Sequence, residues 1–221
     1  MTPSLFEPYQ RLADVLLAHV HPELGDGAHD LAHIQRVWRN VRAIQAKEGG
    51  DLELLLAATV LHDCVAVEKN APLRSQASRL SAEKASSLLA AMGWPLPRVE
   101  QVGHAIHAHS FSAAVEPLSL EARILQDADR LDAIGMIGVA RCFHVSGRIG
   151  SALYDHHNPH ALGRDYQDRR FAIEHFQTKL LALGAGFRTE EGARLAAIRH
   201  QRLQDFYTAF MDEVAGAEAP R

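Results

Sequence analysis

The sequence predicts an all-α fold, and two observations carry this prediction. Apolar residues recur at spacings of three and four along most of the chain, whereas runs that alternate apolar and polar residues are hard to find. The length of 221 residues and a hydrophobic fraction of 47% suffice for one sizeable core. We therefore expect a single helical domain that spans residues 1–221.

Three helices are expected in the first third of the chain. The first covers residues 4–20 and ends where the proline and glycines of HVHPELGDG cannot continue it. Asp30 is suited to cap a second helix over residues 31–47, which a pair of glycines ends. Asp51 then caps a third helix, which is expected to run to about residue 67.

Four further helices follow, separated by turn-forming residues. Residues 75–92 form a helix that ends at GWPLP, and the next helix covers residues 97–109. Residues 118–132 come after a proline and are amphipathic, and a helix over residues 135–147 follows them.

The last third of the chain contains a long irregular stretch. Residues 146–168 mix Gly, Asn, Pro, Asp and His, which predicts a surface loop with little regular structure. Two final helices are expected over residues 168–183 and 189–214, before a polar tail.

Charge and cysteine content exclude several classes of protein. The net charge of −4 and the absence of a Lys/Arg block argue against a nucleic acid or a membrane as the main partner. Cys64 and Cys142 are the only cysteines, too few for a disulfide framework or a four-cysteine zinc site. No signal peptide and no apolar stretch of the roughly 20 residues needed to span a bilayer is evident. A cytoplasmic protein is expected.

An adjacent histidine and aspartate, His62 and Asp63, interrupt the apolar run LLLAATVLHDCVAV. Helical neighbours diverge by about 100°, so both side chains converge only on a point between their directions, and a metal ion fits that point. Burying an unpaired carboxylate costs several kcal/mol without a cation or a hydrogen-bonding partner. The alternative is a helix end at which the two side chains emerge into water.

Two further pairs of ligating residues lie about one helical turn apart. His29 and His33 are four residues apart and share a helix face. Asp129 and Asp132 are three residues apart and also share a face. Taken alone, each pair is interpreted as structural: His29 lies at a helix start, and the two carboxylates near Arg130 fit ordinary surface charge.

Two histidine-rich stretches remain. His104, His107 and His109 lie in HAIHAHS, but the last two are about 200° apart around a helix, so the three cannot all bind one ion from a regular helix. His107 is expected at the surface. The histidines of YDHHNPH, residues 154–160, belong either to a lid or to a flexible exposed loop, and we favour the loop.

In chain order the candidates have the spacing H…HD…D, and here the chain resembles the HD superfamily of metal-dependent phosphohydrolases. More narrowly, it resembles the stand-alone bacterial HD hydrolases of the YedJ and YpgQ type, over most of its length. The stretches that carry the resemblance are HDLAHIQRVWRN, LAATVLHDCV, HAIHAHSFS, ILQDADRLDAIGMIGVAR and, near the C-terminus, HFQTKLL with RTEEGARLAAIRH. The resemblance implies an HD-domain helical bundle with a metal core at about residues 29–135, on which the helices over 168–214 pack.

The resemblance also implies one divalent cation held from three facing helices. Its protein ligands would be His33, His62, Asp63 and Asp129. Two imidazoles and two carboxylates suit an octahedral Mn, Fe, Co, Ni or Mg ion better than a tetrahedral zinc. Asp132 and His29 would orient ligands without binding the ion.

The implied activity is hydrolysis of a small-molecule phosphate ester, in particular a nucleotide. A bound divalent cation acidifies its water and polarises a phosphoryl oxygen, so that hydroxide attacks phosphorus in line, and Asp63 would help to take the proton. His104 and His109 would act as acid or phosphate-binding groups, and Arg36 and Lys69 as phosphate contacts.

The substrate within this class is open at this point. The leading interpretation is a nucleoside or deoxynucleoside triphosphate, released as monophosphate and pyrophosphate. The alternatives are a nucleoside monophosphate phosphatase and a regulatory module that binds a nucleotide without turnover. HD enzymes that hydrolyse guanosine tetraphosphate carry acidic residues where this chain has Ala66 and Val67, which disfavours that substrate.

Overall fold

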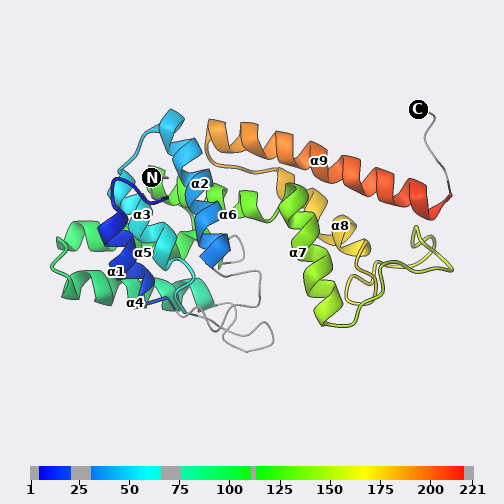
Figure 1. The fold of residues 1–221 in the computed structure, drawn as a ribbon, viewed down its shortest axis with the longest axis horizontal. Coiled ribbons are helices and arrows are strands. Elements are labelled where there is room, and N and C mark those ends of the chain that lie inside the picture. The colour runs from blue at the N-terminus through cyan, green and yellow to red at the C-terminus, as the bar shows by residue number, and fades with distance from the viewer. Residues whose placement is uncertain (1–4, 21–30, 66–75, 111–112, 217–221) are drawn as a thin grey trace. The chain divides into compact units, whose positions relative to one another are not determined.

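The structure is a computed structural model that describes residues 5–20, 31–65, 76–110 and 113–216 (Figure 1). In these ranges the regular structure is helical, with nine α-helices and no strand; an isolated bridge joins Ala152 and Phe171. The all-α prediction is confirmed. None of the helices in these ranges has the length and apolar character that a membrane crossing requires.

The contacts of the chain divide it into two compact units. Unit 1 comprises Met1–Arg130 and Arg188–Gly192, and unit 2 comprises Leu131–Phe187 and Ala193–Arg221. The expectation that the C-terminal helices pack on the metal core remains a prediction.

Unit 1 is built around a helix that is apolar on every side. Its helices, with α6 ending just inside unit 2, are α1 (Gln10–Leu17), α2 (Leu31–Glu48), α3 (Leu52–Leu61), α4 (Ala77–Ala91), α5 (Leu96–His109) and α6 (Leu120–Asp132). All eight residues from Leu54 to Leu61 are buried, as expected of a helix without a polar face. Helix α3 packs against α1, α2 and α5, and α4 packs against α5. His62, which directly follows α3, therefore lies in the interior of unit 1.

Helix α3 ends six residues earlier than the sequence predicted. Asp51 caps its start as expected, accepting a hydrogen bond from the Leu54 amide at 3.0 Å. At the other end the Val65 amide, which a continued helix would direct to the Leu61 carbonyl, donates instead to Ser81 Oγ at 3.2 Å. The prediction of a helix to residue 67 was wrong because α4 captures this backbone group.

Helix α1 is also shorter than predicted. It begins at Gln10 because Pro8 has no amide hydrogen to donate within a helix, and the Phe6 amide is bonded to Gln10 Oε1 at 3.3 Å. The helices predicted over residues 31–47, 75–92, 97–109, 118–132 and 135–147 agree with the observed ones to within two residues at each end.

Unit 2 has a core of its own, rich in aromatic rings. It contains α7 (Gly135–Arg148), α8 (Glu174–Thr178), the 3₁₀ helix η4 (Leu180–Gly184) and most of α9 (Glu190–Val214). Phe176 is fully buried and its ring stacks on Phe206 with centroids 5.7 Å apart. Phe143 lies 6.1 Å from Phe176 and 5.9 Å from Phe206, so the three rings form one cluster.

The single helix predicted over residues 168–183 is wrong, because the structure has two short helices there. The amides of Ala172 and Ile173 donate to the carbonyls of Ala152 and Leu153, at 2.8 and 3.0 Å, and are lost to any helix. Lys179 then interrupts the helical geometry with φ −143° and ψ −59°. Pairing with the preceding loop therefore outcompetes helix propensity in this segment.

The loop between α7 and α8 is irregular, as predicted, but is braced internally. Arg164 makes a bidentate ion pair with Glu174, with Nη2–Oε1 at 2.6 Å and Nη1–Oε2 at 3.0 Å, and also binds Asp155 at 3.1 Å. Asn158 exchanges two hydrogen bonds of 2.9 Å with the backbone of Leu162. These contacts order the loop around the exposed histidines of YDHHNPH.

Truncation of Phe176 to alanine should lower the free energy of unfolding of unit 2 by about 3–5 kcal/mol, because it opens a cavity in the aromatic cluster. Urea denaturation followed by circular dichroism measures the change. Leu162→Ala, at a side chain that is 76% exposed, is the control and should change stability by less than about 0.5 kcal/mol. A loss below about 1 kcal/mol for Phe176→Ala would show that the cluster does not hold unit 2 together.

Candidate metal centre

Two buried imidazoles face each other in unit 1. His33 lies on the buried face of α2, and His62 directly follows the last residue of α3. Their Nε2 atoms are 3.1 Å apart, and the two side chains are 1% and 0% exposed. The alternative in which His62 emerges into water is therefore wrong.

A hydrogen bond to the backbone fixes the orientation of the His62 ring. Its Nδ1 lies 2.7 Å from the Thr59 carbonyl, to which it donates, so Nε2 carries a lone pair toward His33. Burial lowers the pKa of His62 and keeps the ring neutral, although Asp63 opposes this effect. A neutral imidazole, held by a carbonyl on its far nitrogen, is the form that binds metal ions.

Two carboxylates approach the same region from different elements. Asp129 Oδ1, on α6, lies 3.5 Å from His33 Nε2 and 3.9 Å from His62 Nε2. Asp63 Oδ2 lies 3.6 Å from His62 Nε2. The carboxylates are 29% and 37% exposed, so solvent reaches them, whereas the His33 and His62 rings are buried.

A third imidazole completes the cluster. His109, the last residue of α5, is buried, and its Nε2 lies 3.7 Å from Asp63 Oδ1. Its Nδ1 is 2.6 Å from the Ile106 carbonyl, which repeats the arrangement of His62, and the two rings meet edge to face at 4.9 Å. The resemblance implied the same role for His104 and His109, and of the two the structure brings only His109 to Asp63.

The donor set suits a divalent cation. One ligand atom from each of His33, His62 and Asp129 lies within 4.8 Å of the other two, and the same holds for His62, Asp63 and His109. The Nε2 lone pairs of His62 and His109 and the oxygens of Asp63 converge on one region, and a cation between them would relieve their mutual repulsion. A cluster of imidazoles and carboxylates is consistent with a divalent metal ion.

Hydrogen bonds outside the cluster hold the helices that carry it. Asn40 of α2 donates to the Ala128 carbonyl of α6 at 2.9 Å, which joins the helix of His33 to that of Asp129. Asp127 is turned away from the cluster and accepts bonds from the Thr189 amide at 2.8 Å and hydroxyl at 2.7 Å. Burial raises the pKa of Asp127, and the bonds from Arg188 and Thr189 oppose that rise.

Other residues predicted for the site lie as follows. Arg36 is half-buried, one helical turn after His33 on α2. Asp132 is buried in unit 2, where its Oδ2 lies 3.0 Å from Arg141 Nη1. His29 and Lys69 lie outside the described residues, and their roles remain predictions.

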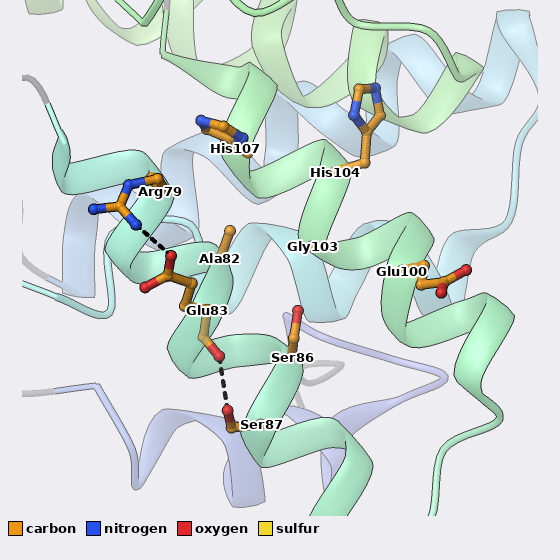
Figure 2. A pocket seen from close by; sticks show the side chains of 9 residues that line it. All are labelled: Arg79, Ala82, Glu83, Ser86, Ser87, Glu100, Gly103, His104 and His107. Atoms are coloured by element: carbon orange, nitrogen blue, oxygen red, sulfur yellow. Dashed lines mark hydrogen bonds and ion pairs between the residues drawn. The ribbon is translucent and has the colours of Figure 1, made fainter.

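His104 is not grouped with the clustered side chains. Its Nε2 accepts a hydrogen bond of 3.0 Å from the Leu118 amide. It lines a pocket between α4 and α5, and Figure 2 shows its ring pointing away from the α4 side chains Ala82 and Ser86. His107, expected at the surface, is half-buried in the wall of this pocket. The proposed acid or phosphate-binding role of His104 has no support from this position.

The cysteines have the environment of core residues. Cys64 and Cys142 are both buried free thiols. Burial raises the pKa of the Cys64 thiol, against the opposing charge of Lys84, and raises that of Cys142 to about 11. Both are therefore protonated near neutral pH, which agrees with the absence of a cysteine nucleophile from the predicted chemistry.

Comparison with known proteins identifies the segment that carries this cluster as an HD domain. A model of the HD domain matches residues 30–134, which contain the whole cluster. YpgQ of Bacillus subtilis, described as uncharacterized, is 33% identical over 195 residues, and the match covers 86% of this chain and 87% of YpgQ.

Solved structures are similar along nearly the whole chain. The crystal structure of B. subtilis YpgQ in complex with ADP matches with a TM-score of 0.72 and 31% identity, covering 95% of this chain and 98% of that one. An HD-superfamily hydrolase from Bacillus thuringiensis matches with a TM-score of 0.70 and 28% identity, covering 92% and 97%.

Replacement of Asp63 by alanine should weaken Mn²⁺ binding by more than about 100-fold, because a carboxylate is lost from the cluster itself. Electron paramagnetic resonance of free Mn²⁺ measures the affinity. Asp205→Ala, at an exposed carboxylate on α9, is the control and should bind as the wild type does. Stoichiometric tight binding by Asp63→Ala would remove Asp63 from the ligand set.

Cys142 should react with iodoacetamide at pH 8 at least about 100-fold more slowly in the folded chain than in urea, because about one thiol in a thousand is ionised when the pKa is about 11. Since the pKa is raised, the labelling rate should keep rising, about tenfold for each pH unit, until the pH reaches that value. Mass spectrometry of timed samples gives the rates. Equal rates in the folded and unfolded chain would contradict the buried position of this thiol.

Proposed function

Because this chain belongs to the HD domain family and is an HD-superfamily hydrolase, we propose that it is a metal-dependent phosphohydrolase acting on a nucleotide. The favoured reaction is hydrolysis of a nucleoside or deoxynucleoside triphosphate to a monophosphate and pyrophosphate. The observation that carries this proposal is a cluster of imidazoles and carboxylates able to hold a cation in a relative of a protein crystallised with ADP.

The position of the carboxylates supports attack on a phosphate that enters from solvent. A divalent cation bound in the cluster would acidify a water molecule and neutralise charge on phosphoryl oxygens. Asp63 is 37% exposed, and its carboxylate is therefore placed to accept the proton of an attacking water that comes from solvent.

His109 is the favoured partner of Asp63 in proton transfer or phosphate binding. Its Nδ1 is held by the Ile106 carbonyl, so Nε2 is directed at Asp63 Oδ1 over 3.7 Å. Arg36, one turn beyond His33, is the proposed contact for a further phosphate oxygen, because a guanidinium offers several donors to a phosphate. Lys69 remains a candidate for the same role from its place in the sequence.

Incubation of the full chain with nucleoside tri-, di- and monophosphates and Mn²⁺, Co²⁺, Ni²⁺ or Mg²⁺ tests the proposal. We expect pyrophosphate and a monophosphate from triphosphates, and loss of at least about 100-fold in turnover for Asp129→Ala, which removes a carboxylate from the cluster. Separate assays for phosphate and pyrophosphate identify the bond that is broken.

The outcomes distinguish the alternatives. Release of phosphate from monophosphates alone would replace the proposal with a monophosphate phosphatase. Nucleotide binding without release of either product, in protein that retains bound metal, would indicate a regulatory module.

A further inference from the structure

The histidine and aspartate at the centre of the site lie beyond the end of a helix. Helix α3 ends at Leu61, and His62 and Asp63 occupy the turn that follows. The position of the Asp63 carboxylate therefore depends on what holds the chain just after it, because helical hydrogen bonds no longer define the backbone there.

Helix α4 holds that part of the chain through Ser81. The Ser81 side chain is fully buried, and its Oγ accepts the Val65 amide at 3.2 Å. Its carbonyl accepts the Cys64 thiol at 3.6 Å. Ser81 thus contacts both residues that follow Asp63.

Lys84, one turn further along α4, makes a second attachment. Its ammonium donates to the Cys64 carbonyl at 3.0 Å and to the His19 carbonyl at 3.1 Å. Cys64 lies just past the end of α3 and His19 just past the end of α1, where helix carbonyls lack partners and a positive charge is stabilised. One side chain therefore joins the ends of two helices at the turn that carries Asp63.

We propose that Ser81 and Lys84 are positioning residues for the cation site: they fix the turn after α3 so that the carboxylate of Asp63 faces His62 and His109. The inference rests on the proposed cation site. Neither residue is predicted to touch the metal or the substrate. Their effect is on the geometry of Asp63, whose two oxygens lie 3.6 and 3.7 Å from the His62 and His109 nitrogens.

Mn²⁺ affinity of the full-length variant Lys84→Met tests this role. Loss of the Lys84 ammonium group should weaken Mn²⁺ binding roughly tenfold, the effect typical of residues that orient metal ligands. Electrostatics alone predicts the opposite sign, because removal of a positive charge near a cation site strengthens cation binding. Lys84→Arg retains a donor for both carbonyls and should restore most of the affinity. Lys47→Met, at an exposed lysine of α2, is the matched control.

Ser81→Ala provides an independent test. Its control is Ser87→Ala, at an exposed serine on the same helix whose hydroxyl donates to the Glu83 carbonyl. Thermal unfolding with EDTA and with saturating Mn²⁺ separates positioning from general stability. We expect the increase in melting temperature caused by Mn²⁺ to shrink in Ser81→Ala and Lys84→Met, and to be unchanged in both controls.

Two results would overturn the inference. One is wild-type or tighter Mn²⁺ binding by Lys84→Met, and the other is a lower melting temperature in EDTA with an unchanged increase on adding Mn²⁺. Asp129→Ala separates these failures from failure of the cation site itself. If Asp129→Ala abolishes binding while Lys84→Met does not change it, the site stands and the positioning role falls; if Asp129→Ala binds as the wild type does, the cation site falls too.

Discussion

The burial of α3 is the constraint on which the rest of unit 1 depends. A helix that is apolar on all sides must be surrounded, and α1, α2 and α5 surround it. Its C-terminal end then lies in the interior, with His62 attached. Polar groups in such a place are tolerated only when each has a partner. Carbonyls behind the His62 and His109 rings meet this requirement for their Nδ1 atoms, and a cation would meet it for the nitrogen and oxygen atoms that converge on the other side.

The site consequently combines rigid and accessible parts. The rings of His33, His62 and His109 are buried and oriented, whereas the carboxylates of Asp63 and Asp129 are partly open to solvent. Under the proposed function, the oriented nitrogens would define where a cation binds, and the accessible oxygens would leave room for water and a phosphate. The segment after Asp63 lies outside the cluster, but its bonds to α4 hold the turn that carries Asp63.

Unit 2 is stabilised by different interactions. Its aromatic cluster supplies apolar contact area, and the Arg164–Glu174 ion pair, buried on the glutamate side, braces the loop that precedes α8. Two short helices form where one was predicted because the amides of residues 172 and 173 are bonded to carbonyls of this loop. A sequence pattern shows the conformation that a segment prefers by itself. It does not show that another part of the chain will take up the hydrogen bonds that this conformation needs.

The sequence by itself determined the helical class, the approximate bounds of most helices, and the residues His33, His62, Asp63 and Asp129 as candidate ligands. The helices follow from residue type and local periodicity, and the ligand set follows from the order H…HD…D together with the resemblance to the HD superfamily. Only the tertiary structure decided that α3 stops at Leu61, that His109 rather than His104 meets Asp63, and that Ser81 and Lys84 hold the turn. Those outcomes depend on which helix ends meet in space, and hydrogen bonds between segments that are distant in sequence leave no periodic signal along the chain.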